Sequence, residues 1–322
     1  MQSKTSGFEQ DNRMPLITVI IPTYNQGKFI ENALQSVLNQ TVEDYEIIVV
    51  NDGSTDNTLE ILRKYESNPK IHVYSQKNRG CPAALNLGLK LAKGRYICWL
   101  SSDDLWYGDK LEKQLEVFLK DEHLGMVYTD SDIIDEDGNI IQKHYKAGDI
   151  NIPLPARIRF INGCSIMIKK ECFESIGVFD EDLKHCHDSD MWLRIGMQYR
   201  MKRVPLPLIK YRMGDNRLSA NKYDDARYSA MLMIKHNLPL EIFFPAFIWG
   251  LGGKKGFSIY ISEAKKEVKR TNRNYFLYRI RTFLFKNGWY YYLAYLNRLI
   301  CSKYEILTDY LKHLPKYLKH QL

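Results

Sequence analysis

The chain has 322 residues, of which 45% are hydrophobic and 26% are charged. This composition indicates a folded, soluble protein and excludes a disordered chain. The length allows one large domain, or one domain with an appendage. The net charge of +8 is unevenly distributed: residues 1–220 carry about 28 basic and 31 acidic side chains, whereas residues 221–322 carry about 18 and 7. The basic character therefore belongs to the C-terminal third.

The spacing of the cysteines indicates the redox compartment, and the hydropathy of the chain bears on a signal peptide and on membrane-spanning helices. The six cysteines are scattered and form no C-x-x-C pair, so we expect free thiols in a reducing compartment. Residues 1–14 are polar and lack the apolar core of a signal peptide, which predicts a loose leader. The longest apolar run, residues 242–251, is shorter than the roughly 20 residues that a membrane-spanning helix needs.

Strand and helix patterns alternate in the first half of the chain. Apolar residues run continuously in the predicted strands and recur at helical spacing between them. Asp56 is a candidate helix cap, Pro82 a candidate helix start and Gly94 a candidate helix end. This β-α-β-α-β-α-β order predicts a parallel, doubly wound sheet. The predicted strands are residues 17–21, 47–50, 71–74 and 96–100, and the predicted helices are residues 29–38, 56–65 and 82–94.

The second half has a mixed pattern. A hairpin-type turn is predicted at residues 135–138, a helix begins near Asp188, and two prolines in residues 205–208 predict a break near the end of the sheet. From about residue 222 the pattern becomes helical. We therefore expect an α/β domain over residues 15–220 and a basic, aromatic-rich helical extension over residues 221–322. The further predicted strands are residues 126–128 and 165–168.

Two predicted strands end directly on acidic turns. Residues 47–50 run into Asp52, and residues 96–100 run into Asp103 and Asp104. In open α/β sheets the carboxyl ends of parallel strands form the edge that binds ligands. Carboxylates from two strands at one edge indicate a nucleotide and metal site.

The common nucleotide motifs are missing. The turn after the first strand contains no G-x-G-x-x-G, and the chain has no G-x-x-x-x-G-K-[ST], which argues against a dinucleotide oxidoreductase and a P-loop NTPase. Pro22 and Tyr24 could instead pack against a flat nucleobase, because a tyrosine ring offers a stacking face. The alternative is that Tyr24 is an ordinary loop aromatic.

Several segments, in this order, resemble the motifs of family 2 glycosyltransferases. The resemblance covers roughly residues 15–215 and implies the GT-A fold, a mostly parallel mixed sheet flanked by helices, together with a nucleotide-sugar donor and a divalent metal. The segments are residues 19–25 (VIIPTYN), 51–58 (NDGSTDNT), 78–80 (NRG), 84–88 (ALNLG), 102–104 (SDD) and 177–181 (GVFDE).

The resemblance implies roles for the donor site. Asp103, with Asp104 as a weaker partner, resembles the family's metal motif, for which Mn²⁺ or Mg²⁺ is suited. Ser101 stands where the family usually has a first aspartate. The ribose contact that this aspartate often makes is therefore not carried over to this chain. Arg212 lies in a segment that resembles the loop closing on the diphosphate. The residues expected to contact the donor are Pro22, Tyr24, Asp52, Asn78, Arg79, Ser102, Asp103 and Arg212.

Residues 187–194 (HDSDMWLR) resemble the segment that supplies the catalytic base. By this resemblance Asp188 deprotonates the acceptor hydroxyl in a single displacement that inverts the anomeric centre. Asp190 and Trp192 are expected to contact the acceptor. His187 replaces the usual Glu, which removes one expected carboxylate. The alternative for Asp188 is a helix cap.

The C-terminal third mixes basic and aromatic residues. Such a pattern suits a helix on an anionic membrane surface, a nucleic acid, a helical partner, or an ordinary subdomain with a solvated basic face. We expect peripheral contact with the inner face of a bacterial cell membrane, within cell-surface polysaccharide synthesis such as that of a capsule, and no nucleic-acid partner.

Two other functions compete with transfer of a sugar, expected to be UDP-linked, to a glycan or lipid-linked acceptor. A metal-dependent nucleotidyltransferase would also use aspartates at strand ends, but residues 22–27 lack its glycine- and lysine-rich loop. A nucleic-acid binder would explain the basic third and leave the acidic edge unexplained.

Overall fold

The computed structural model describes residues 14–147, 154, 158–214, 232 and 235–236. By its internal contacts the chain divides into two units, residues 1–220 and 221–322, and the first holds nearly all described residues. The leader expected at residues 1–14 and the extension expected at 221–322 lie almost entirely outside the described residues. No described helix is long and apolar enough to cross a membrane.

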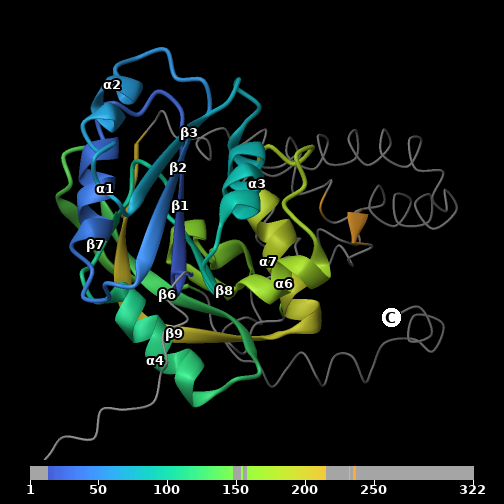
Figure 1. Cartoon of the computed structure of the whole chain (residues 1–322). Helices are drawn as coiled ribbons and strands as arrows, with labels where there is room; N and C mark the ends of the chain where they lie inside the picture. The colour runs from blue at the N-terminus through green and yellow to red at the C-terminus, as the bar shows by residue number, and fades with distance from the viewer. Residues whose placement is uncertain (1–13, 148–153, 155–157, 215–231, 233–234, 237–322) are drawn as a thin grey trace, which may run out of the picture. The chain divides into compact units, whose positions relative to one another are not determined.

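The described part of the chain forms one mixed sheet flanked by helices (Figure 1). Its strands are β1 (Ile17–Thr23), β2 (Tyr45–Asn51), β3 (Ile71–Ser75), β4 (Tyr96–Trp99), β5 (Leu105–Trp106), β6 (Leu124–Ile134), β7 (Ile140–Tyr145), β8 (Ile166–Lys169) and β9 (Arg200–Arg212). Its helices are α1 (Ile30–Leu38), α2 (Thr58–Arg63), α3 (Cys81–Leu91), α4 (Lys110–Lys120), α6 (Lys170–Ile176) and α7 (His187–Gln198), with short 3₁₀ turns η1 (Ile158–Phe160) and η2 (Gly163–Ser165).

The parallel half of the sheet confirms the predicted β-α-β order. Strands β3, β2, β1 and β4 lie side by side in that order and are parallel. Their residues are apolar on both faces because helices cover both. The chain moves outward from β1 to β3 and then returns to the other side of β1 to form β4. The point of reversal therefore lies between β1 and β4.

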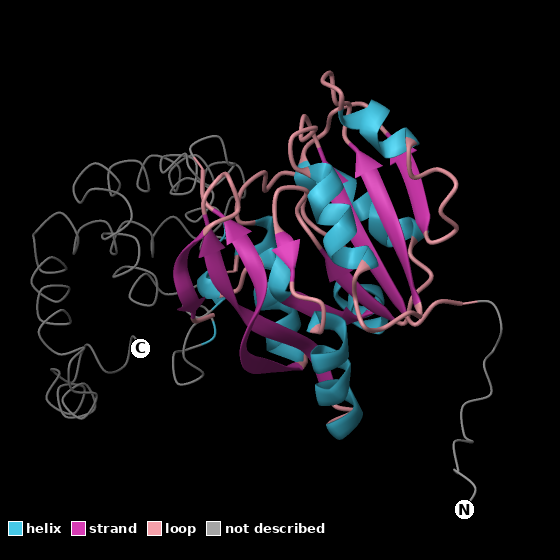
Figure 2. Cartoon of the chain, turned by 90° about the vertical axis from the view of Figure 1, so that its left-hand side faces the viewer, coloured by secondary structure: helices cyan, strands magenta, loops and turns pink. Residues whose placement is uncertain are grey.

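The other half of the sheet departs from the parallel pattern. β8 is antiparallel to both β4 and β6, β9 is parallel to β6, and β7 forms a hairpin with β6, so that the sheet is mixed and curled (Figure 2). The break predicted at residues 205–208 is wrong. β9 continues through both prolines, and its pairing with β6 shifts register where Pro207 meets Asp130. Proline lacks an N–H donor, and such an irregularity accommodates it.

Helices pack closely on both faces of the parallel half of the sheet and hold its strands in place. Figure 1 shows α1 and α3 on opposite faces of the sheet. Val19 and Ile21 join the core cluster with Leu34 and Val37 of α1. On the other face, a Cβ added to Gly88 of α3 would lie 2.4 Å from a methyl of Ile20, so glycine permits the close approach of this helix. The first strand is thereby held rigidly on both sides, with its carboxyl end at the point of chain reversal.

Candidate functional site

The two acidic turns flank the first strand at the edge predicted from the sequence. β2 and β4 are the two neighbours of β1, and Asp52 and Ser101 follow their ends. The amide of Asp52 donates to the carbonyl of Thr23 at 2.8 Å, and the amide of Leu100 donates to that of Ile20 at 3.0 Å. The site therefore lies where open α/β sheets bind ligands, beside the reversal of strand order.

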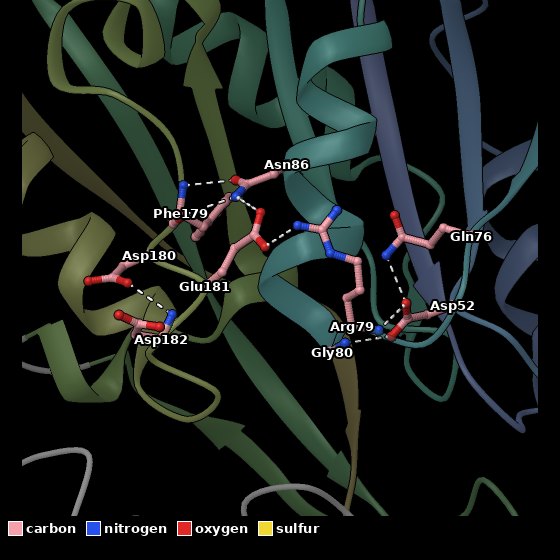
Figure 3. A network of polar contacts seen from close by, with 9 residues as sticks. All are labelled: Asp52, Gln76, Arg79, Gly80, Asn86, Phe179, Asp180, Glu181 and Asp182. Atoms are coloured by element: carbon pink, nitrogen blue, oxygen red, sulfur yellow. Dashed lines mark hydrogen bonds and ion pairs between the residues drawn. The ribbon is translucent and has the colours of Figure 1, made fainter.

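The carboxylate of Asp52 holds the loop that leads into α3 (Figure 3). Oδ1 accepts from Gln76 Nε2 at 2.7 Å and from the amide of Arg79 at 2.9 Å, and Oδ2 accepts from the amide of Gly80 at 2.8 Å. Gly53 has φ of +77°, and a Cβ there would lie 2.9 Å from the amide nitrogen of Asn78. The N-D-G turn and the loop 76–80 are thus one closely packed unit.

Arg79 extends from this unit toward the segment before α7 (Figure 3). Its NH2 lies 2.7 Å from Glu181 Oε2, in an ion pair whose side chains are 60% and 38% exposed. Asn86 of α3 donates to Glu181 Oε1 at 3.1 Å and to the carbonyl of Phe179 at 2.9 Å, and its own Oδ1 accepts from the Phe179 amide at 2.9 Å. The network joins the NRG, ALNLG and GVFDE segments.

The predicted base-stacking residues lie at the end of β1. Pro22 is buried within the strand, whereas the Tyr24 side chain just beyond it is 46% exposed. An exposed aromatic ring beside Asp52 is available to a flat ligand. Asn78 is exposed on the neighbouring loop.

The turn of residues 101–104, after β4, contains two neighbouring aspartates in different surroundings. Asp104 is fully buried: Oδ1 accepts from the amide of Arg212 at 2.8 Å, and the Cys164 thiol donates to Oδ2 at 3.0 Å. Burial, followed by the charge of Asp103, raises the pKa of Asp104 well above its usual value. Asp103 is partly exposed, its carboxylate accepts no side-chain hydrogen bond from the described residues, and burial raises its pKa.

Ser101 and Ser102 complete this turn. The amide of Ser101 donates to Cys164 Sγ at 3.1 Å, while Ser102 is buried. Asp104 does not cap α4, because the short strand β5 intervenes and this helix begins after Asp109. Asp104 therefore anchors the turn to β9 and η2, and Asp103 is its accessible carboxylate.

Arg212 is engaged within the fold. Its Nε donates to the carbonyl of Asp103 at 2.7 Å, and its NH1 donates to the carbonyls of Asp135 and Glu136 at 2.8 and 2.7 Å. The guanidinium also lies over the ring of Phe29, 4.7 Å from its centroid. Arg212 thus holds the turn of residues 101–104 in place through the carbonyl of Asp103, and direct contact with a diphosphate stays a prediction.

Asp188 lies in the first turn of α7 and is partly exposed. Its Oδ1 accepts from the amide of Ser189 at 2.7 Å. A negative charge in this position is favoured by the helix dipole. The helix begins after Cys186, whose φ of +57° turns the chain sharply. The predicted base therefore sits on a rigid element at the end of a tight turn.

The structure gives Asp190 and Trp192 core positions instead of acceptor contacts. Neither side chain has any exposed surface. Asp190 Oδ2 lies 2.8 Å from Arg194 Nε, and the Trp192 indole donates to the carbonyl of Ile161 at 3.3 Å. A side chain without exposed surface cannot touch a substrate, so we do not retain these two residues as acceptor contacts.

The electrostatics of Cys81 show which aspartates converge. Cys81 is the first residue of α3 and is partly buried. Burial raises the pKa of its thiol, and the charges of Asp188, Asp52 and Asp103 raise it further. Three carboxylates from three separate segments therefore act on one point at the helix start. The donor, metal and base candidates are far apart along the chain, and the fold brings them near the start of α3.

Sequence reasoning missed several residues of this site. Cys164 was read only as a free thiol, although it contacts Asp104 and Ser101. Glu181 was part of a recognised segment without a role. Trp99 was read as a strand residue and Thr23 as part of the turn after the first strand, yet each carries a buried polar atom with no partner among the described residues. A tryptophan that ends an apolar strand directly before an acidic turn is the signal that could have identified Trp99.

Comparison with known proteins identifies the family. The model of the family described as Glycosyl transferase family 2 matches residues 18–177. An uncharacterized glycosyltransferase of Rickettsia typhi is 39% identical over 218 residues, which are 65% of this chain and 67% of that protein. The hyaluronan synthase of Pasteurella multocida is 36% identical over 198 residues, 60% of this chain and 20% of that protein. The chain thus spans a small part of such larger relatives.

Solved structures share the fold. Staphylococcus aureus TarS 1–349 in complex with UDP-GlcNAc matches with a TM-score of 0.58 and 18% identity, over 77% of this chain and 79% of that chain. The mannosyltransferase PcManGT from Pyrobaculum calidifontis, in complex with GDP-Man and Mn²⁺, matches with a TM-score of 0.59 and 21% identity, over 91% and 89%. With this architecture, a matching family model and a relative aligned over two thirds of its length, the chain belongs to glycosyl transferase family 2 and has the GT-A fold.

Proposed function

We propose that this glycosyltransferase transfers a sugar from a UDP-sugar donor to a hydroxyl of a glycan or lipid-linked acceptor, with inversion and with a divalent metal. The observation that carries the proposal is the convergence of Asp52, Asp103 and Asp188 around the start of α3. These three groups supply the carboxylates that a single displacement needs: one for the nucleoside, one for the metal and one for the acceptor proton.

Asp52 and Tyr24 would hold the nucleoside. The two oxygens of Asp52 accept three hydrogen bonds from the protein. A carboxylate has about four acceptor positions, so one remains for a uracil N–H or a ribose hydroxyl. The exposed ring of Tyr24 offers the stacking face. The UDP-GlcNAc bound by the structural neighbour TarS supports a uridine donor.

The chemistry of the turn of residues 101–104 fits a divalent metal bound together with the donor. In the described part of the chain no group of three or more His, Cys, Asp or Glu side chains is arranged to hold a metal. Mg²⁺ and related ions are commonly held by one or two carboxylates plus substrate phosphates. Asp103 alone can therefore be the carboxylate ligand that the protein supplies. Bound there, the metal would neutralise charge on the diphosphate leaving group.

Asp188 would act as the base. Its Oδ1 is held by the amide of Ser189, and its Oδ2 has no partner among the described residues. An acceptor hydroxyl that donates to Oδ2 can lose its proton there as its oxygen attacks the anomeric carbon and the bond to the diphosphate breaks. The proton ends on Asp188 and the electron pair on the leaving UDP.

Binding and turnover test this proposal directly. Calorimetry should detect UDP binding that strengthens with Mn²⁺, and UDP-GlcNAc should release UDP slowly even with water as acceptor. A nucleotidyltransferase would instead require a nucleoside triphosphate, and a nucleic-acid binder would prefer an oligonucleotide. NMR of the product should show an inverted anomeric centre. A product with retained configuration would exclude the single displacement.

The proposed setting is cell-surface polysaccharide synthesis on the inner face of the cell membrane. Relatives named hyaluronan and chondroitin synthases support a glycan product. The basic, aromatic-rich residues 221–322 lie almost entirely outside the described residues, and their composition supports contact with an anionic membrane.

A further inference from the structure

The loop that follows β1 is bonded residue by residue to the loop that follows β2. Three consecutive amides of the first loop each donate to a side chain of residues 54–58. The bonds run from Asn25 to Ser54 Oγ at 3.0 Å, from Gln26 to Thr58 Oγ1 at 2.9 Å and from Gly27 to Asp56 Oδ2 at 3.0 Å. The backbone of the first loop is therefore held by the second one, although it belongs to no helix or strand.

Asn25 also binds the second loop through its side chain. Its Oδ1 accepts from the amide of Thr55 at 2.8 Å. The backbone of Asn25 has a φ of +54°, in the left-handed region, which asparagine adopts more readily than most residues that carry a side chain. This one residue therefore turns the chain after β1 and ties it, through both a donor and an acceptor, to the loop that carries Asp52.

Tyr24 lies between two fixed points of the backbone. On one side of it, the carbonyl of Thr23 accepts from the amide of Asp52 at 2.8 Å. On the other side, Asn25 is bonded to the segment that begins two residues after Asp52. The Tyr24 side chain itself is 46% exposed. An accessible aromatic ring is thus carried by a short piece of backbone that is held at both ends.

A fixed backbone strengthens binding to an exposed ring because it reduces what binding has to order. Immobilising a side chain and its loop costs free energy, and a loop that is already ordered in the ligand-free protein avoids that cost. Stacking on a flat nucleobase also depends on the orientation of the ring. We propose that Asn25 is a positioning residue for the donor, which orients Tyr24 against the nucleobase without touching the nucleotide; this assignment rests on the proposed function.

Two ligands distinguish a positioning residue from an ordinary turn residue. Inorganic pyrophosphate with Mg²⁺ has the diphosphate but no base, whereas UDP with Mg²⁺ has both. A residue that only stabilised the fold would affect the binding of both ligands alike. A residue that orients Tyr24 affects only the ligand that carries a nucleobase. The affinities for UDP and pyrophosphate, measured side by side by calorimetry, therefore separate the two roles.

Asn25→Gly is the test variant, and Tyr24→Ala removes the ring itself. Glycine keeps the left-handed backbone and loses only the hydrogen bonds that Thr55 donates to Oδ1 of Asn25. Asn68→Gly is the matched control, because Asn68 Oδ1 accepts from the amide of Lys70 at 3.0 Å in the turn before β3, at the opposite edge of the sheet. The two asparagine variants should lower Tm by similar amounts.

The expected result is a loss of affinity that depends on the base and on the ring. Asn25→Gly should weaken UDP binding by about two- to tenfold, the cost of ordering one side chain and its loop on binding. Its pyrophosphate affinity should stay unchanged, and Asn68→Gly should bind both ligands normally. Tyr24→Ala should weaken UDP binding by about 5- to 100-fold, the loss of one base–aromatic stack. In the Tyr24→Ala background, Asn25→Gly should add no further loss, because no ring remains to be oriented.

Three outcomes would overturn the assignment. Unchanged UDP affinity in Asn25→Gly would mean that Tyr24 does not depend on this residue. Equal weakening of UDP and pyrophosphate would give Asn25 a structural role only, and a loss that persists in the Tyr24→Ala background would mean that Asn25 acts by another route. Failure of the proposed function has a different signature: the unmodified chain would bind UDP no better than pyrophosphate, or Tyr24→Ala would keep full UDP affinity, and the assignment would fall with it.

Discussion

Asp103 and Asp104 are neighbours in the sequence but present their carboxylates to different surroundings. Both oxygens of Asp104 are bonded, to the Arg212 amide and the Cys164 thiol, and the residue is buried. Asp103 is partly exposed and its carboxylate is unbonded to any described side chain. One position of the pair therefore builds the turn while the other remains available to a ligand.

This difference predicts opposite outcomes for the two amide substitutions. Asp103→Asn should remove the metal-dependent part of UDP affinity and leave Tm nearly unchanged. Asp104→Asn should keep most of that affinity, because the Arg212 amide retains an oxygen acceptor. Calorimetry with and without Mn²⁺ measures both. Metal-dependent binding that survives in Asp103→Asn and disappears in Asp104→Asn would reverse the two roles.

The base prediction uses the two aspartates of the first turn of α7. Asp188→Asn should keep UDP affinity and slow sugar transfer by about two to four orders of magnitude, the range for loss of a general base. Asp190→Asn should act on stability, since it breaks a buried pair with Arg194 at a cost on the order of 3 kcal/mol. Turnover and denaturant unfolding separate the two effects. Near-normal transfer by Asp188→Asn would assign the base elsewhere.

Most of the parallel half was predictable because its signals are local. Continuous apolar strands, the Asn51–Asp52–Gly53 turn and Pro82 at the start of α3 each determine structure within a few residues. The placement of Asp52 and Asp103 at one edge followed from strand order alone. Non-local pairing explains the errors. Continuation of β9 through Pro205 and Pro207 depends on its register with β6, which no local pattern encodes.

The motifs predicted which residues belong to the site, but they did not predict which of those residues are buried. Asp188, Asp190 and Trp192 belong to one segment, and only the packing of α7 leaves the first partly exposed and buries the other two. Arg212 likewise has the residue type expected of a phosphate ligand, yet backbone carbonyls far away in sequence occupy its Nε and NH1. Sequence resemblance transfers residue types, whereas their availability depends on contacts that the fold alone determines.

The ion pair between Arg79 and Glu181 gives a third prediction. Exposed ion pairs contribute about 0–1 kcal/mol, so Glu181→Gln should change the free energy of unfolding by less than that. If Arg79 contacts the donor, Arg79→Ala should weaken UDP-sugar binding several-fold with a marked salt dependence, since a charge contact is lost. Glu116→Gln, which breaks an exposed pair with Lys113 on α4, is the control. Equal donor affinity in Arg79→Ala and the unmodified chain would remove Arg79 from the donor site.

The membrane proposal predicts a charge-dependent association. Each basic residue near an anionic surface contributes on the order of 1 kcal/mol, and 1 M salt shortens the Debye length to about 3 Å. Sedimentation with phosphatidylserine-containing vesicles should show binding at low salt that weakens steeply as salt rises. A chain truncated after residue 220 should lose this binding and keep its UDP affinity, because the donor motifs all lie before that point. A full-length chain that ignores the vesicles at low salt would leave a partner-binding or structural role for residues 221–322.

The buried Lys110 predicts a pH dependence of stability. Its side chain has no exposed surface, its Nζ donates to Gln114 Oε1 at 2.7 Å and lies 4.0 Å from the centroid of the Trp106 ring, and burial lowers its pKa from 10.5 to about 8. Between these values the unfolded chain binds more protons than the folded chain, so this group's contribution to stability rises with pH. The full rise is at most about 3 kcal/mol.

A substitution of Lys110 separates its contribution to stability from those of the cysteines and tyrosines, which also titrate in this pH range. Lys110→Met keeps the length of the side chain and removes the charge. It should be more stable than the unmodified chain at pH 7, and this advantage should shrink as the pH rises from 8 toward 10.5. Lys113→Met, on the solvent side of α4, should show no such trend between pH 8 and 10. Denaturant unfolding at several pH values measures the difference, and an advantage of Lys110→Met that is constant over this range would mean that Lys110 remains charged in the folded protein.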